Sequence, residues 1–115
     1  MKTITAEQIT NAVKKMCVEA NIFLPQDIKD ALCAAAETET GTSRDILMQL
    51  KENYTIAETE QMPVCQDTGM TVVFAEIGQD VHLSGALFEE AVAEGVRQGY
   101  AEGYLRKSVV QDPIL

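Results

Sequence analysis

The sequence has few of the residues that disulfide frameworks and common ligand sites require. It contains three cysteines, three arginines and one histidine, and no CxxC pair occurs. The odd number and wide spacing of the cysteines argue against a disulfide framework. With His82 as the one imidazole, a complete zinc site within the chain would need an unusual set of ligands. An acidic substrate would find at most Arg44, Arg97 and Arg106 as guanidinium anchors, so other anchors would come from outside this chain.

Long apolar segments are missing too. No run is long enough to cross a membrane, and the first ten residues, MKTITAEQIT, lack the apolar core of a secretory signal. We therefore expect a soluble, cytoplasmic protein. The net charge of −9, from 18 acidic and 9 basic residues, repels phosphate backbones and argues against nucleic-acid binding. The 115 residues, 46% of them apolar, are enough for one small domain with a core.

The first half of the chain has the periodicity of three helices. Thr5 and Gln8 have the spacing of a capping box, Pro25 suits the first position of a second helix, and Gly41 ends that helix before Thr42 opens a third. The stripe of the first helix consists of Ile9, Val13, Met16, Cys17 and Ala20. The buried side expected for the third consists of Ile46, Leu47, Leu50, Tyr54 and Ala57. Cys17 and Cys33 fit helical stripes, which predicts structural roles for both.

The pattern changes after Pro63. Residues 70–78, MTVVFAEIG, are β-branched and aromatic and predict a buried strand. A second short strand is expected to end near Ser84, a helix to cover residues 86–104, and a further strand to begin in residues 107–111. We therefore predict an α+β fold in one domain, helical over residues 1–62, with a loop, short sheet and packed helix over 63–115.

Two features of this second half predict close contacts with other segments. Gly95, Gly99 and Gly103 recur every fourth residue in the last helix, where each costs about 1 kcal/mol relative to alanine, so we expect a neighbouring backbone to approach closely. Asp112-Pro113 predicts a turn into further chain. We expect an N-terminal fragment of a longer subunit, whose incomplete sheet self-associates through residues 70–78 or 107–111.

The segment Cys65–Gly69 gathers a thiol, an amide, a carboxylate, a hydroxyl and a glycine directly before the predicted strand. A polar loop at the end of a rigid strand is a frequent place for a site. As a nucleophile, Cys65 would need a base, and His82 is the one histidine. As a metal or cluster ligand it would need thiolates from beyond this chain. The residues alone leave nucleophile, ligand and structural cysteine open.

PVCQDTGMTVVFAEIG, residues 63–78, resembles the cluster-binding motif of the class I, iron–sulfur-dependent fumarate hydratases. The two-subunit forms carry this motif in the alpha subunit, as do the similar L-tartrate dehydratases. The three-helix start and the segment GYLRKSVVQDP agree with the resemblance. It covers nearly the whole chain but only the N-terminal part of such a subunit.

The resemblance implies a hydro-lyase that hydrates fumarate to L-malate, with a 4Fe–4S cluster whose open iron acts as a Lewis acid. It makes Cys65 the first of three cluster ligands, Gln66 and Asp67 substrate contacts, and Asp67 also a catalytic residue that organises the base. Arg106 would bind a substrate carboxylate. The other two cluster cysteines should lie beyond this chain, which by itself should be inactive. A beta subunit is the implied partner.

Three alternatives accompany this prediction. One is the alpha subunit of L-tartrate dehydratase, which acts on a related hydroxy diacid. Another is a non-enzymatic helical interaction module with a buried, structural Cys65. The last is a cysteine-nucleophile enzyme, which requires Cys65 and His82 within hydrogen-bond reach; otherwise His82 is expected to be structural or exposed.

Overall fold

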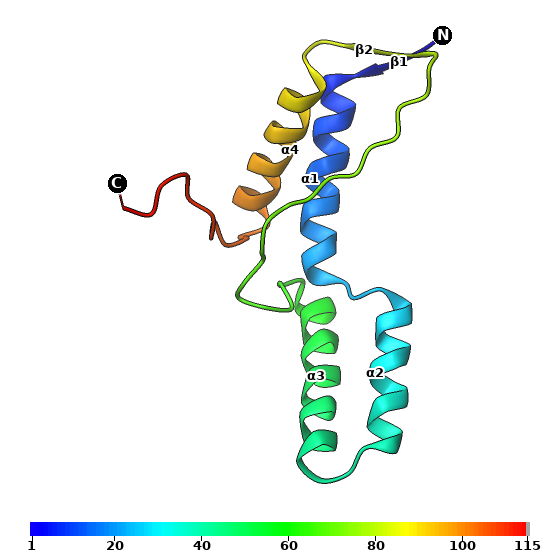
Figure 1. Cartoon of the computed structure of the whole chain (residues 1–115), viewed down its shortest axis with the longest axis vertical. Helices are drawn as coiled ribbons and strands as arrows, with labels where there is room; N and C mark the ends of the chain where they lie inside the picture. Colours follow the sequence, from blue (N-terminus) through cyan, green and yellow to red (C-terminus); the bar gives the residue numbers. More distant parts are fainter. Residues whose placement is uncertain (115) are drawn as a thin grey trace. The chain divides into compact units, whose positions relative to one another are not determined.

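The computed structural model describes residues 1–114 as two strands and four helices. In chain order these are β1 (Lys2–Thr5), α1 (Ala6–Ile22), α2 (Gln26–Thr38), α3 (Gly41–Glu60), β2 (Val81–Ser84) and α4 (Phe88–Glu102) (Figure 1). The predicted α+β class is confirmed. The predicted order is not, because a strand precedes the three helices and pairs with the strand that follows them. Within these residues, no helix has both the length and the apolar character that a membrane span requires.

The chain divides into two compact units. Unit 1 combines Met1–Val18 with the residues from Asp67 onward, and unit 2 is the continuous segment Glu19–Gln66. Unit 2 contains α2 and α3, whereas unit 1 contains the sheet, most of α1, and α4. The single domain expected over residues 1–115 stays a prediction.

Unit 2 contains a helical hairpin whose boundaries follow local sequence signals. α2 begins directly after Pro25, as predicted, because the fixed φ of proline suits a helix start. α3 begins at Gly41, one residue before the predicted Thr42. Gln61 then ends α3 in a left-handed conformation with φ 53°, and its N–H donates to the Ala57 carbonyl.

The apolar stripe of α3 is buried only in part. Ala57 is 2% exposed, whereas Ile46 and Leu50 are 52% and 45% exposed. The prediction that all five stripe residues are buried was wrong for these two, and Leu47 and Tyr54 are only half-buried. The reason is geometric: one neighbouring helix covers a narrow strip of α3, and the stripe is wider than that strip.

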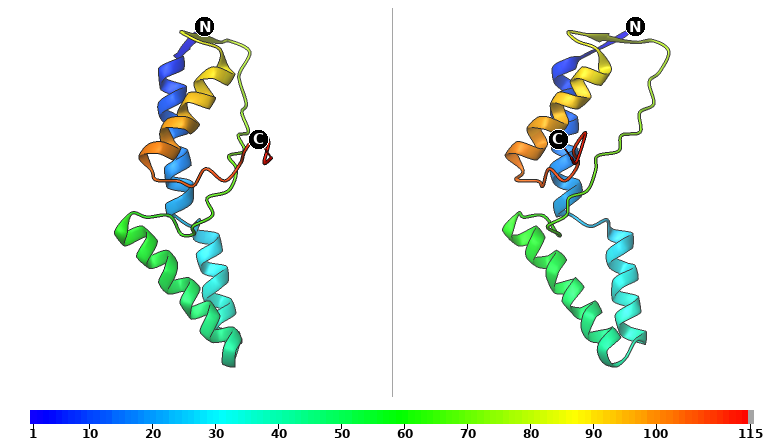
Figure 2. Two further views of the ribbon diagram at one scale, coloured as in Figure 1. Left: turned by 90° about the vertical axis from the view of Figure 1, so that its left-hand side faces the viewer. Right: turned by 60° about the vertical axis from the view of Figure 1, so that its left-hand side comes forward.

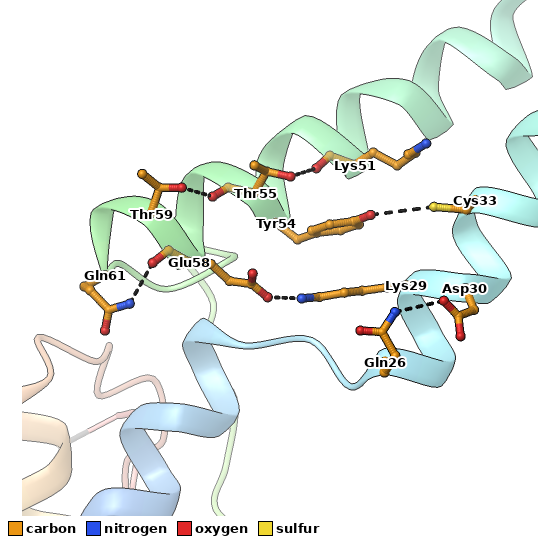
Figure 3. A network of polar contacts seen from close by, with 10 residues as sticks. All are labelled: Gln26, Lys29, Asp30, Cys33, Lys51, Tyr54, Thr55, Glu58, Thr59 and Gln61. Atoms are coloured by element: carbon orange, nitrogen blue, oxygen red, sulfur yellow. Dashed lines mark hydrogen bonds and ion pairs between the residues drawn. The ribbon is translucent and has the colours of Figure 1, made fainter.

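Polar contacts join α2 to α3 (Figure 3). Lys29 forms an ion pair with Glu58, and its Nζ lies 5.3 Å from the centre of the Tyr54 ring. The Cys33 Sγ lies 3.8 Å from the Tyr54 hydroxyl. The contact with Cys33, and then partial burial, raise the pKa of Tyr54. Cys33 therefore has a structural place between the two helices, in agreement with its predicted role.

Unit 1 begins with a strand that leads directly into α1. The Gln8 N–H donates to the Thr5 Oγ1 at 3.2 Å, and the Thr5 N–H donates to the Gln8 Oε1 at 2.9 Å. These two bonds confirm the predicted capping box. β1 pairs in parallel with β2, from Lys2 opposite Val81 to Thr5 opposite Ser84. β2 was predicted and β1 was not.

The first part of α1 packs against α4 along the glycine stripe (Figure 1). A Cβ added at Gly95 would lie 2.7 Å from both the Thr10 carbonyl oxygen and the Val13 Cβ. At Gly99 it would lie 3.0 Å from the Cys17 Cβ. Such distances leave room for hydrogen but not for a methyl group. The predicted close approach is confirmed, and the neighbour is a helix.

The core of unit 1 is built on this contact. Val13, Cys17 and Leu105 are 4%, 7% and 5% exposed. The residues packed around them are Ile9, Val92, Val96 and Tyr100. The buried Thr10 hydroxyl donates to the Ala91 carbonyl at 2.9 Å, which ties α1 to α4 through a second kind of contact.

Two predicted strands do not form. Residues 70–78 run as an extended chain without strand pairing (Figure 2), and Val72 and Phe74 are 67% and 94% exposed. Residues 107–111 are likewise outside any strand. A strand needs a neighbour for its N–H and C=O groups, and among residues 1–114 neither segment has one. Within the described part of the chain, the sheet therefore consists of β1 and β2.

Candidate functional site

Cys65 lies in the loop that follows α3, and the residue before it is held from two sides. The Val64 N–H donates to the Asn21 carbonyl at 2.8 Å. The Asn53 Nδ2 donates to the Val64 carbonyl at 2.7 Å. Both bonds lie within unit 2 and fix the backbone that presents the thiol.

The three cysteines differ in accessibility. Cys17 is buried, Cys33 is half-buried and Cys65 is exposed, and none forms a disulfide. The Cys17 Sγ lies 3.9 Å from the Thr71 Oγ1, which agrees with its predicted structural role. The interaction-module alternative required a buried Cys65 thiol, and the exposed thiol counts against it.

Asp67 and Gly69 form a tight turn at the start of the second part of unit 1. The Gly69 N–H donates to the Asp67 Oδ1 at 3.0 Å. Gly69 has φ +65°, and a Cβ built there would meet nothing within 4 Å. Glycine is therefore favoured by the left-handed backbone and not by lack of space. The turn holds one oxygen of an exposed carboxylate in place.

Thr68 connects this turn to Arg106, 38 residues later in the chain. The Arg106 N–H donates to the Thr68 Oγ1 at 2.9 Å, and the same hydroxyl donates to the Arg106 carbonyl at 3.1 Å. The structure thus places the backbone of Arg106 against the residue that follows Asp67, and both Asp67 and Arg106 were predicted for substrate binding. Among residues 1–114, the Arg106 guanidinium makes no ion pair.

Tyr100 holds the other side of the turn. Its hydroxyl donates to the Gly69 carbonyl at 3.2 Å and accepts from the Thr71 hydroxyl at 3.1 Å. Its carbonyl accepts from the Leu105 N–H at 3.0 Å, directly before Arg106. A cavity of about 560 Å³ opens beside these groups. Its lining includes Gly69, Thr71, Tyr100 and Lys107.

One basic side chain beside this cavity is already paired with a carboxylate. Arg97, which also lines it, donates through Nε to the Glu94 Oε2 at 2.6 Å. The hydrogen bond from Arg97, and then the one from Gln98, lower the pKa of Glu94 to about 2. Arg97 is therefore engaged within α4, whereas Arg106 is available for an anion.

The predicted site residues fall in both units. Cys65 and Gln66 are exposed residues of unit 2, and Asp67 and Arg106 are exposed residues of unit 1. The structure joins Asp67 to Arg106 through Thr68. His82 is an exposed residue of β2 in unit 1, which confirms the expectation that it is structural or exposed.

A metal or cluster would find one ligand in this part of the chain. Across residues 1–114, no three His, Cys, Asp or Glu side chains are grouped as a metal site. The exposed thiol of Cys65 fits a single thiolate ligand, and the remaining ligands of a cluster would have to come from elsewhere. The donor set is compatible with the implied cluster as one contribution to it.

Comparison with known proteins defines the class to which this fold and site belong. The family model described as Fumarate hydratase (Fumerase) matches residues 10–115. The chain belongs to this family, which confirms the resemblance that the CQDTG motif indicated.

Individual relatives fall into two named groups. A putative L(+)-tartrate dehydratase subunit alpha from Methanocaldococcus jannaschii is 39% identical over 105 residues, covering 90% of this chain and 37% of that protein. The anaerobic class I fumarate hydratase of Escherichia coli K12 is 36% identical over 107 residues, 91% of this chain and 19% of that enzyme. The aerobic class I enzyme of the same organism is 29% identical over 109 residues, with the same two coverages. The chain thus spans 19% to 37% of the length of these relatives.

The contacts of Thr68, Tyr100 and Asn53 were not foreseen from the sequence. Thr68 was noted as a group able to bond a polar ligand, because it stands inside the motif. Its hydroxyl instead bonds the backbone of Arg106. Tyr100 carries no local signal beyond its place after Gly99, and Asn53 lies on a helix face that the periodicity leaves polar.

Proposed function

We propose that this chain is part of a hydro-lyase that adds water reversibly to fumarate to give L-malate. Membership of the fumarate hydratase family supports this reaction, as do the names of the two Escherichia coli relatives. Dehydration of L-tartrate to oxaloacetate is the second candidate, because a relative named for that reaction is 39% identical.

One observation carries the proposal: within the family-matched segment, the exposed cysteine is the one in the CQDTG motif. We propose Cys65 as one of three cysteine ligands of a 4Fe–4S cluster. When bound, such a cluster supplies an open iron as a Lewis acid for the hydroxyl group that leaves in the dehydration direction. Hydroxide is a poor leaving group near neutral pH, so the reaction needs this assistance.

The neighbouring residues bind and orient the diacid. Arg106 offers a planar guanidinium that pairs a carboxylate with two hydrogen bonds, and Gln66 offers an amide that can donate to or accept from the substrate. Asp67 contacts the substrate and organises the base that removes the carbon-bound proton. The Asp67–Gly69 bond restrains the Asp67 carboxylate, and the Thr68–Arg106 bonds restrain the Arg106 backbone, before substrate binds. Such restraint favours catalysis by positioning.

Further partners belong to the proposal. The Methanocaldococcus relative is named as a subunit alpha, so we propose an enzyme with a second, beta subunit. Self-association of the chain through residues 70–78 or 107–111 also stays a proposal. For residues 70–78, the support is the exposure of Val72 and Phe74 in an extended, unpaired segment. A cytoplasmic location remains a prediction from the sequence.

The test uses the complete coding region with its partner subunit, reconstituted anaerobically with iron and sulfide. The wild type should gain the visible absorbance of a cluster and hydrate fumarate. Cys65→Ala should lose both, because a thiolate ligand is removed, whereas Cys33→Ala should keep both as the matched control. Cluster and turnover retained in Cys65→Ala would refute the assignment. Parallel assays with fumarate, L-malate and L-tartrate decide between the two candidate substrates.

A further inference from the structure

We propose that Thr68 is the positioning residue that aims Arg106 at a carboxylate of the substrate. The inference rests on the proposed function, because it assumes that Arg106 binds a dicarboxylate. It goes beyond that function by assigning a role to a hydroxyl that contacts the protein itself. The observation that carries it is the pair of bonds between one side chain and both backbone groups of Arg106.

These two bonds fix the backbone orientation of Arg106. The Thr68 Oγ1 accepts from the Arg106 N–H at 2.9 Å and donates to the Arg106 carbonyl at 3.1 Å. When the N–H and C=O of one residue are both held, its Cα–Cβ direction is set as well. A long side chain amplifies any error in that direction, so the guanidinium position depends on these bonds.

The surroundings keep both partners of the pair in place. Leu105, directly before Arg106, is 5% exposed and anchors the segment in the core. Its N–H bonds the Tyr100 carbonyl, and the Tyr100 hydroxyl bonds the Gly69 carbonyl directly after Thr68. The same tyrosine therefore fixes both sides of the Thr68–Arg106 pair.

Tyr104 lies at the end of α4 and turns the chain towards Arg106. It has φ 54°, a left-handed conformation that is uncommon for a residue other than glycine. Here it belongs to the end of the helix, because the Leu105 N–H bonds the carbonyl of Tyr100, five residues earlier, as in a Schellman motif. The turn at Tyr104 redirects the chain after α4, so that Arg106 reaches the Asp67–Gly69 turn.

The test compares variants of the complete, reconstituted enzyme with its partner subunit. Thr68→Val keeps the shape and removes the hydroxyl, Thr68→Ser keeps the hydroxyl, and Thr59→Val is the matched control. Thr59 is suitable because its exposed hydroxyl bonds a backbone carbonyl, that of Thr55, at 2.8 Å within α3. The readouts are kcat and KM for the diacid that the wild type converts, the dissociation constant of succinate by calorimetry, and iron content with the visible spectrum.

Thr68→Val should raise both KM and the succinate dissociation constant by roughly tenfold to a hundredfold, because displacement of a positioning group by about 1 Å has effects of this size. Its iron content and spectrum should match the wild type. Thr68→Ser and Thr59→Val should stay within about twofold, since serine keeps the bonds and position 59 lies on α3. In an Arg106→Lys background, Thr68→Val should add less than about twofold, because residues that act together are not additive.

Three results would overturn the inference: unchanged succinate binding in Thr68→Val, equal losses in the valine and serine variants, or full additivity with Arg106→Lys. Loss of the cluster together with activity in Thr68→Val would also overturn it, because the residue would then hold the fold and not Arg106. Failure of the proposed function would give a result that can be told apart from these. In that case the wild type itself neither converts nor binds a dicarboxylate, whatever Thr68 does.

Discussion

Substitution of Gly95 by alanine tests the packing between α1 and α4. The added Cβ would lie 2.7 Å from the Thr10 carbonyl oxygen and from the Val13 Cβ, 0.7 Å less than the 3.4 Å at which ordinary contact begins. Neither atom can rotate away, because one is a backbone oxygen and the other is a Cβ, whose position the backbone fixes. The helices must therefore separate, which also stretches the bond from Thr10 to the Ala91 carbonyl.

The net effect follows from three terms. Overpacking costs about 3 kcal/mol at the upper end of its usual range, and a weakened buried hydrogen bond costs up to about 1 kcal/mol more. Alanine recovers about 1 kcal/mol of helix propensity. We expect Gly95→Ala to lower the free energy of unfolding by about 2–3 kcal/mol. Gly99→Ala should be milder, because its Cβ would lie 3.0 Å from the Cys17 Cβ and 3.1 Å from the Lys14 carbonyl oxygen.

The assay must separate the two units. Amide hydrogen exchange of α1 residues such as Val13 reports the opening of unit 1, and α3 amides report unit 2. Gly95→Ala should speed exchange in α1 far more than in α3. Ala93→Gly, at an exposed position of α4, measures helix propensity alone and should cost about 1 kcal/mol. A Gly95→Ala chain as stable as the wild type would show that the two helices do not pack as described.

Two further predictions concern local interactions. Thr5→Ala should lower the free energy of unfolding by about 1 kcal/mol, because the hydroxyl that accepts from the Gln8 N–H is lost. Thr5→Ser should restore most of it in a urea titration, and equal losses in both variants would contradict the capping role. The pKa of Glu94 lies at about 2, below its ordinary 4.5, because Arg97 hydrogen-bonds the carboxylate. The stabilisation is therefore complete above pH 4.5 and is lost as the pH falls towards 2. The difference in unfolding midpoint between wild type and Glu94→Gln should shrink over that range, and a constant difference would refute it.

Sequence reasoning located the features that depend on neighbouring residues. The capping box at Thr5 and the start of α2 after Pro25 need only a few consecutive positions. The glycine stripe from Gly95 onward also stands within one helix, so a close approach could be predicted without knowledge of the partner. Features that need a distant partner were missed or wrong. β1 is four residues long and is defined by its pairing with Val81–Ser84.

For the extended segment 70–78, the sequence predicted a strand that the structure does not contain. Its β-branched and aromatic residues have the composition of a strand, but composition does not supply a neighbour for the backbone groups. The site residues likewise divide into those that a local motif identifies and those that depend on a distant contact. Cys65, Gln66, Asp67 and Arg106 were proposed from a contiguous motif and a resemblance, whereas the bonds of Thr68 to Arg106 span 38 positions and have no local signature.

The order of the units along the chain has a consequence for folding during synthesis. Unit 2 is continuous, so all of its residues are present once Gln66 has been made. Unit 1 is discontinuous, and β1 and the first turns of α1 stay without partners until β2 and α4 follow. Contacts between such distant positions form slowly because a long loop must close first. The contacts within unit 2 can therefore form before those that join the two separate segments of unit 1.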